Sequence, residues 1–104
     1  MTNIIVEYES VVCRSQAPVE TQIDGEVVLM NLDRDRCYGL GQTGSEIWRR
    51  LGSPISVAVL CNDLERKYQA PTGVIANDVM KLLRELAMEE LIEIHEPVKP
   101  RLKV

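Results

Sequence analysis

The stretch VVLMNLDRDRCYGLGQTGSEIWRRL, residues 27–51, contains two strand patterns, a charged turn and the start of a helix. Its first part, residues 27–32, is apolar on both faces, which is typical of the central strand of a small sheet. Residues 33–36 (DRDR) predict a turn, and residues 36–40 (RCYGL) predict the next strand. After Leu40 the pattern becomes helical. This stretch therefore predicts the junction between a sheet and a set of helices.

Apolar and polar side chains alternate through residues 19–23 (VETQI), just upstream of that stretch. Such alternation is typical of a strand with one solvated face. The Asp24-Gly25 pair that follows is a strong signal for a type I′ turn, so residues 19–23 and 27–32 are expected to form a hairpin. Residues 1–17 show no such pattern and are expected to be irregular.

Three helices are predicted downstream of the strands. The TGSE sequence fits a capping box, in which Thr43 and Glu46 each bond the backbone N–H of the other. The second helix starts at Ser56, and the third spans roughly residues 72–90, where apolar side chains recur at helical spacing. Residues 95–104 contain two prolines and are expected to form a loose tail.

This order of elements predicts an α+β domain over residues 18–94. It consists of a three-stranded antiparallel sheet followed by three helices, and it is similar to a winged helix. The length of 104 residues suits one small domain. Phe is absent, so aliphatic side chains must form most of the core.

Composition excludes several classes of protein. The net charge of −4 and the sequence pI of about 5.0 oppose nucleic-acid binding, which depends on clustered Lys and Arg. No apolar run approaches the ~20 residues of a membrane span, and the N-terminus has no secretion signal. The cysteines, Cys13, Cys37 and Cys61, form neither a CxxC pair nor a disulfide framework. A cytoplasmic protein with reduced thiols and no membrane association is expected.

The sequence GLGQTG, residues 39–44, matches the G-x-G-x-x-G fingerprint of dinucleotide-binding folds. Asp63, nineteen positions after Gly44, stands near the place of a ribose-binding carboxylate. However, the helical pattern of residues 57–68 continues past Asp63, and a crossover helix between Gly44 and Pro54 would be short. The match is therefore interpreted as accidental.

Gly39 needs a separate explanation because glycine weakens a strand unless another backbone approaches it closely. The third predicted strand has only one predicted neighbour, so its other edge is expected to be open. Gly39 is explained either by a β-bulge or by an edge kept open for a guest strand. The sequence leaves both explanations open.

No catalytic group is predicted. The serines lack a G-x-S-x-G motif, and there is no phosphate-binding loop. His95 has no Cys or carboxylate at ligand spacing and is interpreted as inert. Trp48 is interpreted as a core anchor of the first helix. We therefore expect a binding protein, without a metal or cofactor, and not an enzyme.

The order and spacing of these elements resemble the PqqD-like family. These are the leader-peptide recognition domains (RiPP recognition elements) of pathways that modify ribosomally made peptides. The resemblance covers roughly residues 18–94. It rests on three features: a Leu after the strand–turn–strand, a T-G-x-x-I-W helix start and a D-V-x-x-L-L-x-x-L helix. In this sequence the first is Leu40, the second is Thr43, Gly44, Ile47 and Trp48, and the third is Asp78, Val79, Leu82, Leu83 and Leu86. Gly41 departs from the family, which often has Asn there.

The resemblance implies that a precursor leader adds as an antiparallel strand to the third strand, beside the third helix. The leader-binding residues implied on these two elements are Arg36, Cys37, Tyr38, Gly39, Leu40, Ile75, Asp78, Val79, Lys81, Leu82, Glu85 and Leu86. Core packing is the alternative role for the apolar members, and it is favoured for Leu40. A solvated helix face is the alternative for the charged ones. Which flank of the third helix faces the leader stays open.

The expected function is to bind a leader and present it to a separate leader protease, cyclase or other tailoring enzyme. The lasso-peptide type is favoured, with pyrroloquinoline quinone assembly as the runner-up. A winged-helix DNA-binding regulator is the alternative. Residues 72–91, however, carry two basic and four acidic side chains, and a net charge of −2 would repel phosphate.

Overall fold

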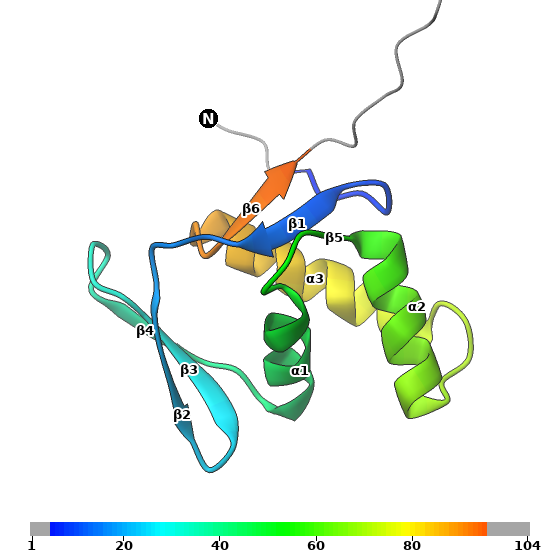
Figure 1. Cartoon of the computed structure of the whole chain (residues 1–104), viewed down its shortest axis with the longest axis horizontal. Coiled ribbons are helices and arrows are strands. Elements are labelled where there is room, and N and C mark those ends of the chain that lie inside the picture. Colours follow the sequence, from blue (N-terminus) through cyan, green and yellow to red (C-terminus); the bar gives the residue numbers. More distant parts are fainter. Residues whose placement is uncertain (1–4, 96–104) are drawn as a thin grey trace, which may run out of the picture.

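The computed structural model describes residues 5–95, which form three helices and two small three-stranded antiparallel sheets. The elements are β1 (Val11–Arg14), β2 (Val19–Ile23), β3 (Glu26–Asn31), β4 (Arg36–Gly39), α1 (Gln42–Arg50), β5 (Ile55–Ser56), α2 (Val57–Tyr68), α3 (Val74–Met88) and β6 (Ile92–His95). In Figure 1 the β2–β3–β4 sheet lies at one end of the molecule and α2 at the other, with α1 and α3 between them. The predicted α+β class is confirmed.

The first sheet has the strand order β2–β3–β4 and contains the predicted hairpins. Asp24 and Gly25, between β2 and β3, have φ angles of 54° and 80°, as a type I′ turn requires. β3 is the central strand, and every second residue of it is buried. The ladder between β3 and β4 continues without interruption to Val28 opposite Gly39. Gly39 therefore lies in a regular strand, and the β-bulge explanation is wrong.

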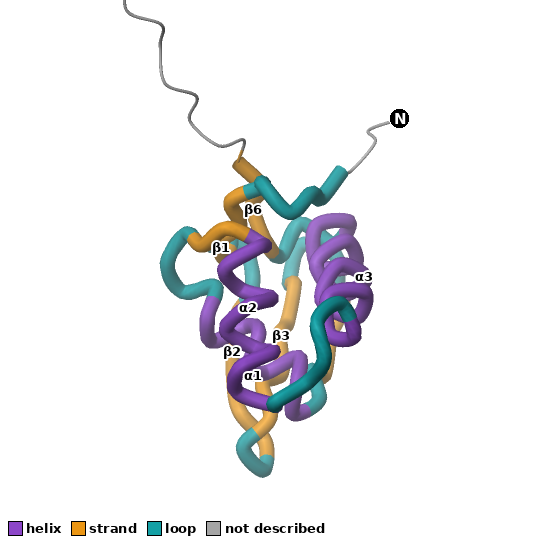
Figure 2. Tube along the Cα trace, turned by 90° about the vertical axis from the view of Figure 1, so that its right-hand side faces the viewer, coloured by secondary structure: helices purple, strands orange, loops and turns teal. Residues whose placement is uncertain are grey.

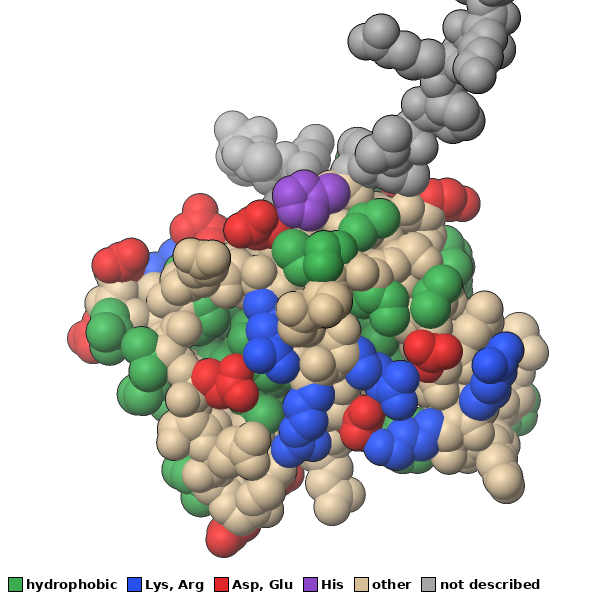
Figure 3. Space-filling view, viewed as in Figure 1, with side chains coloured by type: hydrophobic (Ala, Val, Ile, Leu, Met, Phe, Trp, Pro, Cys, Tyr) green, Lys and Arg blue, Asp and Glu red, His purple; other side chains and the backbone are tan. Residues whose placement is uncertain are grey.

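All five residues of β2 are exposed, the apolar ones included. Val19 and Ile23 are 44% and 59% exposed, and Figure 3 shows hydrophobic side chains at the surface on this end of the molecule. Glu20 is also exposed, and it accepts a hydrogen bond from Trp48 Nε1 at 2.8 Å. The alternation of side chains thus predicted the strand, but neither of its faces is buried.

The second sheet, of order β5–β1–β6, was not predicted. All four residues of β1 pair with β6. The expectation that residues 1–17 are irregular is therefore wrong for β1, and His95 of the expected tail belongs to β6. Residues 96–104 lie outside the described residues. These strands are short and their partners are distant in the sequence, so no local turn signal indicates the pairing.

The start of α1 differs from the predicted capping box. Gly41 is the N-cap residue, and no side chain caps this helix. The buried hydroxyl of Ser45 joins the sheet to the helix instead: it accepts a hydrogen bond from Val27 N–H at 2.8 Å and donates one to Leu40 O at 3.0 Å. Glu46, one half of the predicted box, forms ion pairs with other residues.

The start of α2 agrees with the sequence. The Ser56 hydroxyl caps it by accepting a hydrogen bond from Val59 N–H at 3.2 Å. Asp63 lies inside this helix, with Oδ2 at 3.5 Å from Arg50 Nη1, so no parallel strand ends at this carboxylate. The rejection of a dinucleotide-binding fold is confirmed. No helix of the described chain is both long and apolar enough to cross a membrane.

Gly44 is explained by close packing. A Cβ atom at this position would lie 3.3 Å from Leu40 Cβ, closer than ordinary van der Waals contact, and 3.7 Å from Leu82 Cδ2. The absence of a side chain lets the first turn of α1 lie against the end of β4 and against α3. Figure 2 shows the same region from the side, with β3 between α1 and α3 in the view.

Candidate functional site

The outer edge of β4 is open. β4 pairs with β3 on one side, and no other strand of the described residues pairs with it. Leu40 N–H donates to Val27 O at 2.8 Å, and hydrogen-bonded residues alternate along an antiparallel ladder. Tyr38 therefore also turns its backbone groups to β3. Cys37 and Gly39 turn their N–H and C=O groups outward, to the free edge.

A groove of about 520 Å³ lies between β4 and α3, next to this edge. Its β4 side consists of the strand and the residue after it, and its other side consists of the second half of α3 and the residues that follow. The lining residues are Cys37, Tyr38, Gly39, Leu40, Leu82, Glu85, Leu86, Met88, Glu89 and Leu91. Most of these side chains are apolar, so the groove combines free backbone groups with an apolar wall.

Seven of the twelve expected binding residues line this groove: Cys37, Tyr38, Gly39, Leu40, Leu82, Glu85 and Leu86. The other five lie elsewhere. Val79 is fully buried and packs in the core, so it has no surface to offer a ligand. Ile75 is half-buried against the same core. Asp78 and Lys81 are exposed on α3 outside the groove, and Arg36 is exposed beside one end of it.

Three lining residues were missed, namely Met88, Glu89 and Leu91. A signal for one of them was present: Glu89 continues the helical spacing of Leu82 and Glu85, at intervals of three and four residues. Met88 is 63% exposed and offers an apolar side chain at the mouth of the groove. The groove thus lies nearer the C-terminal end of α3 than the sequence indicated.

The carboxylate of Glu89 bridges the two sides of the groove by bonding to residues of β4. Tyr38 Oη donates to Glu89 Oε2 at 2.5 Å, and Arg36 Nη1 donates to Oε1 at 2.9 Å. Arg34, in the turn before β4, approaches Oε2 to 3.3 Å. The Tyr38 hydrogen bond, and after it the charges of Arg36 and Arg34, hold the pKa of Glu89 below its ordinary value. Desolvation and the same hydrogen bond raise the pKa of Tyr38.

We expect Glu89 to contribute to the acid sensitivity of the fold. The pKa of Glu89 is lower in the folded protein than in the unfolded chain. The ionised carboxylate therefore stabilises the fold at pH values above the unfolded pKa of about 4.3, and this contribution is lost as the pH falls through the pKa of the folded protein. Glu89→Gln should therefore reduce the difference in urea midpoint between neutral and acidic buffer. Part of the difference should remain, because bonding to Lys67 also lowers the pKa of Glu46. An unchanged pH dependence in the variant would contradict this role.

His95 is not isolated, contrary to the sequence interpretation. Its Nε2 atom lies 3.3 Å from Glu93 Oε1, and the thiol of Cys13 is close to both. The pairing of β1 with β6 creates this cluster, which sequence spacing does not show. None of its three residues lines the groove.

A free strand edge beside an apolar groove is the arrangement of a peptide-binding module. Residues 26–92 match the model of the family described as coenzyme PQQ synthesis protein D (PqqD). The chain belongs to the PqqD family. Members of this family are non-catalytic peptide-binding proteins, so the chain is a binding protein and not an enzyme.

One solved structure is similar over most of the chain. It is TbiB1 in complex with the TbiA(beta) leader peptide, with 32% sequence identity and a TM-score of 0.69. The match covers 78% of this chain and 94% of that chain. A search among curated proteins found no match.

Proposed function

We propose that this protein binds the leader of a ribosomally synthesised precursor peptide by strand addition to β4, beside α3. The observation that carries the proposal is the open edge of β4 next to the apolar groove. A relative with 32% identity, whose structure was solved in complex with a leader peptide, supports it. In this mode, main-chain hydrogen bonds give affinity and pockets for alternate side chains give specificity.

The guest strand bonds to Cys37 and Gly39, whose outward N–H and C=O groups each contribute about 0.5–1.5 kcal/mol net when paired. Alternate side chains of the guest then face α3. Leu82 and Met88 offer apolar surface on that side, so the leader carries apolar residues two positions apart. Charged leader residues that pair with Asp78, Lys81 or Glu85 add at most about 1 kcal/mol each, because such surface ion pairs are weak.

The bound leader delivers its precursor to a separate enzyme. Holding the leader raises the effective concentration of the attached core peptide near a leader protease, cyclase or other tailoring enzyme. We propose a cytoplasmic pathway of the lasso-peptide type, with pyrroloquinoline quinone assembly as the runner-up.

Titration with labelled leader peptides tests the proposal. Leaders of precursors encoded beside the gene should bind with a Kd below ~100 μM by fluorescence polarisation. At that affinity the contacts more than offset the several kcal/mol that ordering a disordered leader costs. A scrambled peptide of the same composition is the control. Failure of every neighbouring leader to bind in this range would refute the function, and the leader that binds identifies the pathway.

A charge at the mouth of the groove should weaken this binding. Met88→Glu places a carboxylate against the apolar leader side chains, and we expect a loss of about 1–3 kcal/mol in binding, or roughly 5- to 150-fold in Kd. Val74→Glu is the matched control, because Val74 is on the same helix with 59% exposure against 63% for Met88 but does not line the groove. Equal losses in both variants would contradict the proposed location.

A further inference from the structure

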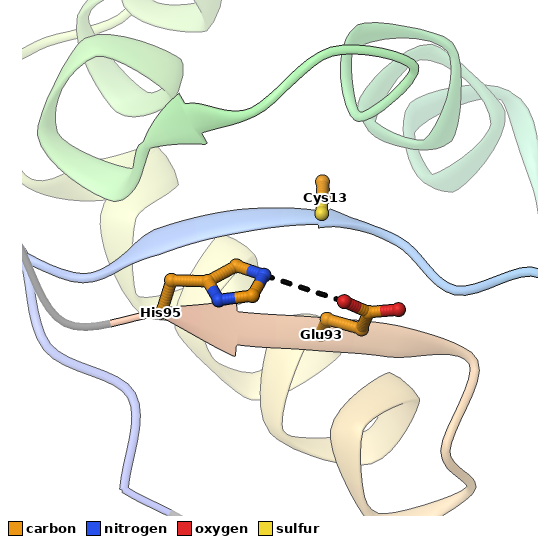
Figure 4. A group of neighbouring side chains, drawn as sticks. All are labelled: Cys13, Glu93 and His95. Carbon is orange, nitrogen blue, oxygen red and sulfur yellow. Dashed lines mark ion pairs between the residues drawn. The ribbon is translucent and has the colours of Figure 1, made fainter.

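The second sheet brings three metal-ligating side chains together on one face. Cys13 on β1 pairs with Glu93 on β6, and His95 follows two residues later on the same side of β6. Figure 4 shows the three side chains next to one another. One ligand atom from each residue lies within 4.8 Å of the other two. These donors are a thiol sulfur, a carboxylate oxygen and an imidazole nitrogen.

We propose that Cys13, Glu93 and His95 form a binding site for a divalent cation of the zinc class. Zn²⁺ takes the same three kinds of ligand at about 2.0–2.3 Å in tetrahedral geometry, which places ligand atoms about 3.3–3.7 Å apart. The distances between ligand atoms therefore need to shorten by at most about 1.5 Å around the ion. The mixture of sulfur and nitrogen donors selects Zn²⁺ and its neighbours over Mg²⁺ and Ca²⁺, which prefer oxygen ligands.

The strand pairing positions the site. β1 and β6 pair along all four residues of each, which fixes the three Cβ positions relative to one another. Cys13 is half-buried, while the side chains of Glu93 and His95 are exposed. The fourth ligand position thus faces solvent, where water completes the tetrahedron. An ion bound here links the N-terminal strand to the C-terminal one.

Cobalt provides a direct test, because Co²⁺ substitutes for Zn²⁺ and absorbs light. Adding Co²⁺ to the full chain under reducing conditions should produce a thiolate-to-metal charge-transfer band and the intense visible bands of a tetrahedral ion, with one ion per chain. Zn²⁺ should displace it. Cys13→Ser should abolish the charge-transfer band, and His95→Ala should weaken binding at least about tenfold, since it removes one of three ligands. Circular dichroism shows whether each variant remains folded.

Cys37→Ser is the matched control, because Cys37 is an exposed free thiol outside the cluster. This variant should keep the full cobalt spectrum. Absence of a charge-transfer band in the parent protein at Co²⁺ concentrations on the order of 1 mM would overturn the site. A band that survives Cys13→Ser and disappears in Cys37→Ser would overturn it as well. The readout does not involve a leader peptide, so its outcome is independent of the proposed function.

Discussion

Gly39→Pro should abolish most leader binding while the protein remains folded. The N–H of Gly39 points to the free edge, so proline removes a donor that the fold itself does not use. Proline is tolerated on an edge strand for this reason. A Cβ at this position would meet no atom within 4 Å. The ring then occupies space that the guest backbone needs, and we expect at least about a tenfold increase in Kd from the lost bond and the clash.

Two companion variants separate binding from folding. Gly39→Ala keeps the N–H and adds only a methyl group in open space, so its Kd should stay within about threefold of the parent. Tyr38→Pro removes an N–H that faces β3, so it should lower the urea midpoint instead. If Gly39→Pro is folded and binds the leader as tightly as the parent, strand addition at β4 is wrong.

Trp48→Ala should cause the largest loss of stability. Trp48 is 1% exposed, its Nε1 donates to Glu20, and the guanidinium of Arg14 stacks 5.0 Å from the ring centroid. Truncation of a buried Trp costs about 3–5 kcal/mol. Small domains have only about 5–15 kcal/mol in total, so the variant should lose a large share of its stability and unfold at a much lower urea concentration.

Urea unfolding followed by circular dichroism measures this effect, because the variant contains no tryptophan for fluorescence. Trp48→Phe is the informative comparison. It keeps a large apolar ring but loses the N–H that satisfies Glu20, so its cost should be intermediate. A midpoint for Trp48→Ala equal to that of the parent would show that the core does not depend on this residue.

Local chemistry accounts for the elements that the sequence predicted correctly. The Asp24-Gly25 turn, the Ser56 cap and the helical spacing of α3 each depend on residues a few positions apart. The open edge of β4 was also predicted, because a strand followed directly by helices has only one neighbour. The groove was located on the correct two elements, although five of the twelve proposed residues fall outside it.

The errors have a common cause in contacts between distant residues. The partners of β1 are β5 and β6, which are distant in the sequence and are placed beside it by the packing of the helices. Glu20 bonds to an indole N–H that lies 28 residues further along the chain. The expected capping box is absent because α1 begins earlier, with Gly41 as its N-cap, and Ser45 bonds Val27 N–H of the sheet, 18 residues away.

The sequence by itself determined the strands β2, β3 and β4, the three helices and the exposed edge of β4, because turns, caps and periodicity are encoded over a few residues. The tertiary structure alone decided that β1 pairs with β5 and β6. It also decided that Glu89 holds α3 against β4 and that Cys13 meets His95. These features depend on strand register and helix docking, which place residues from opposite ends of the chain within hydrogen-bonding distance.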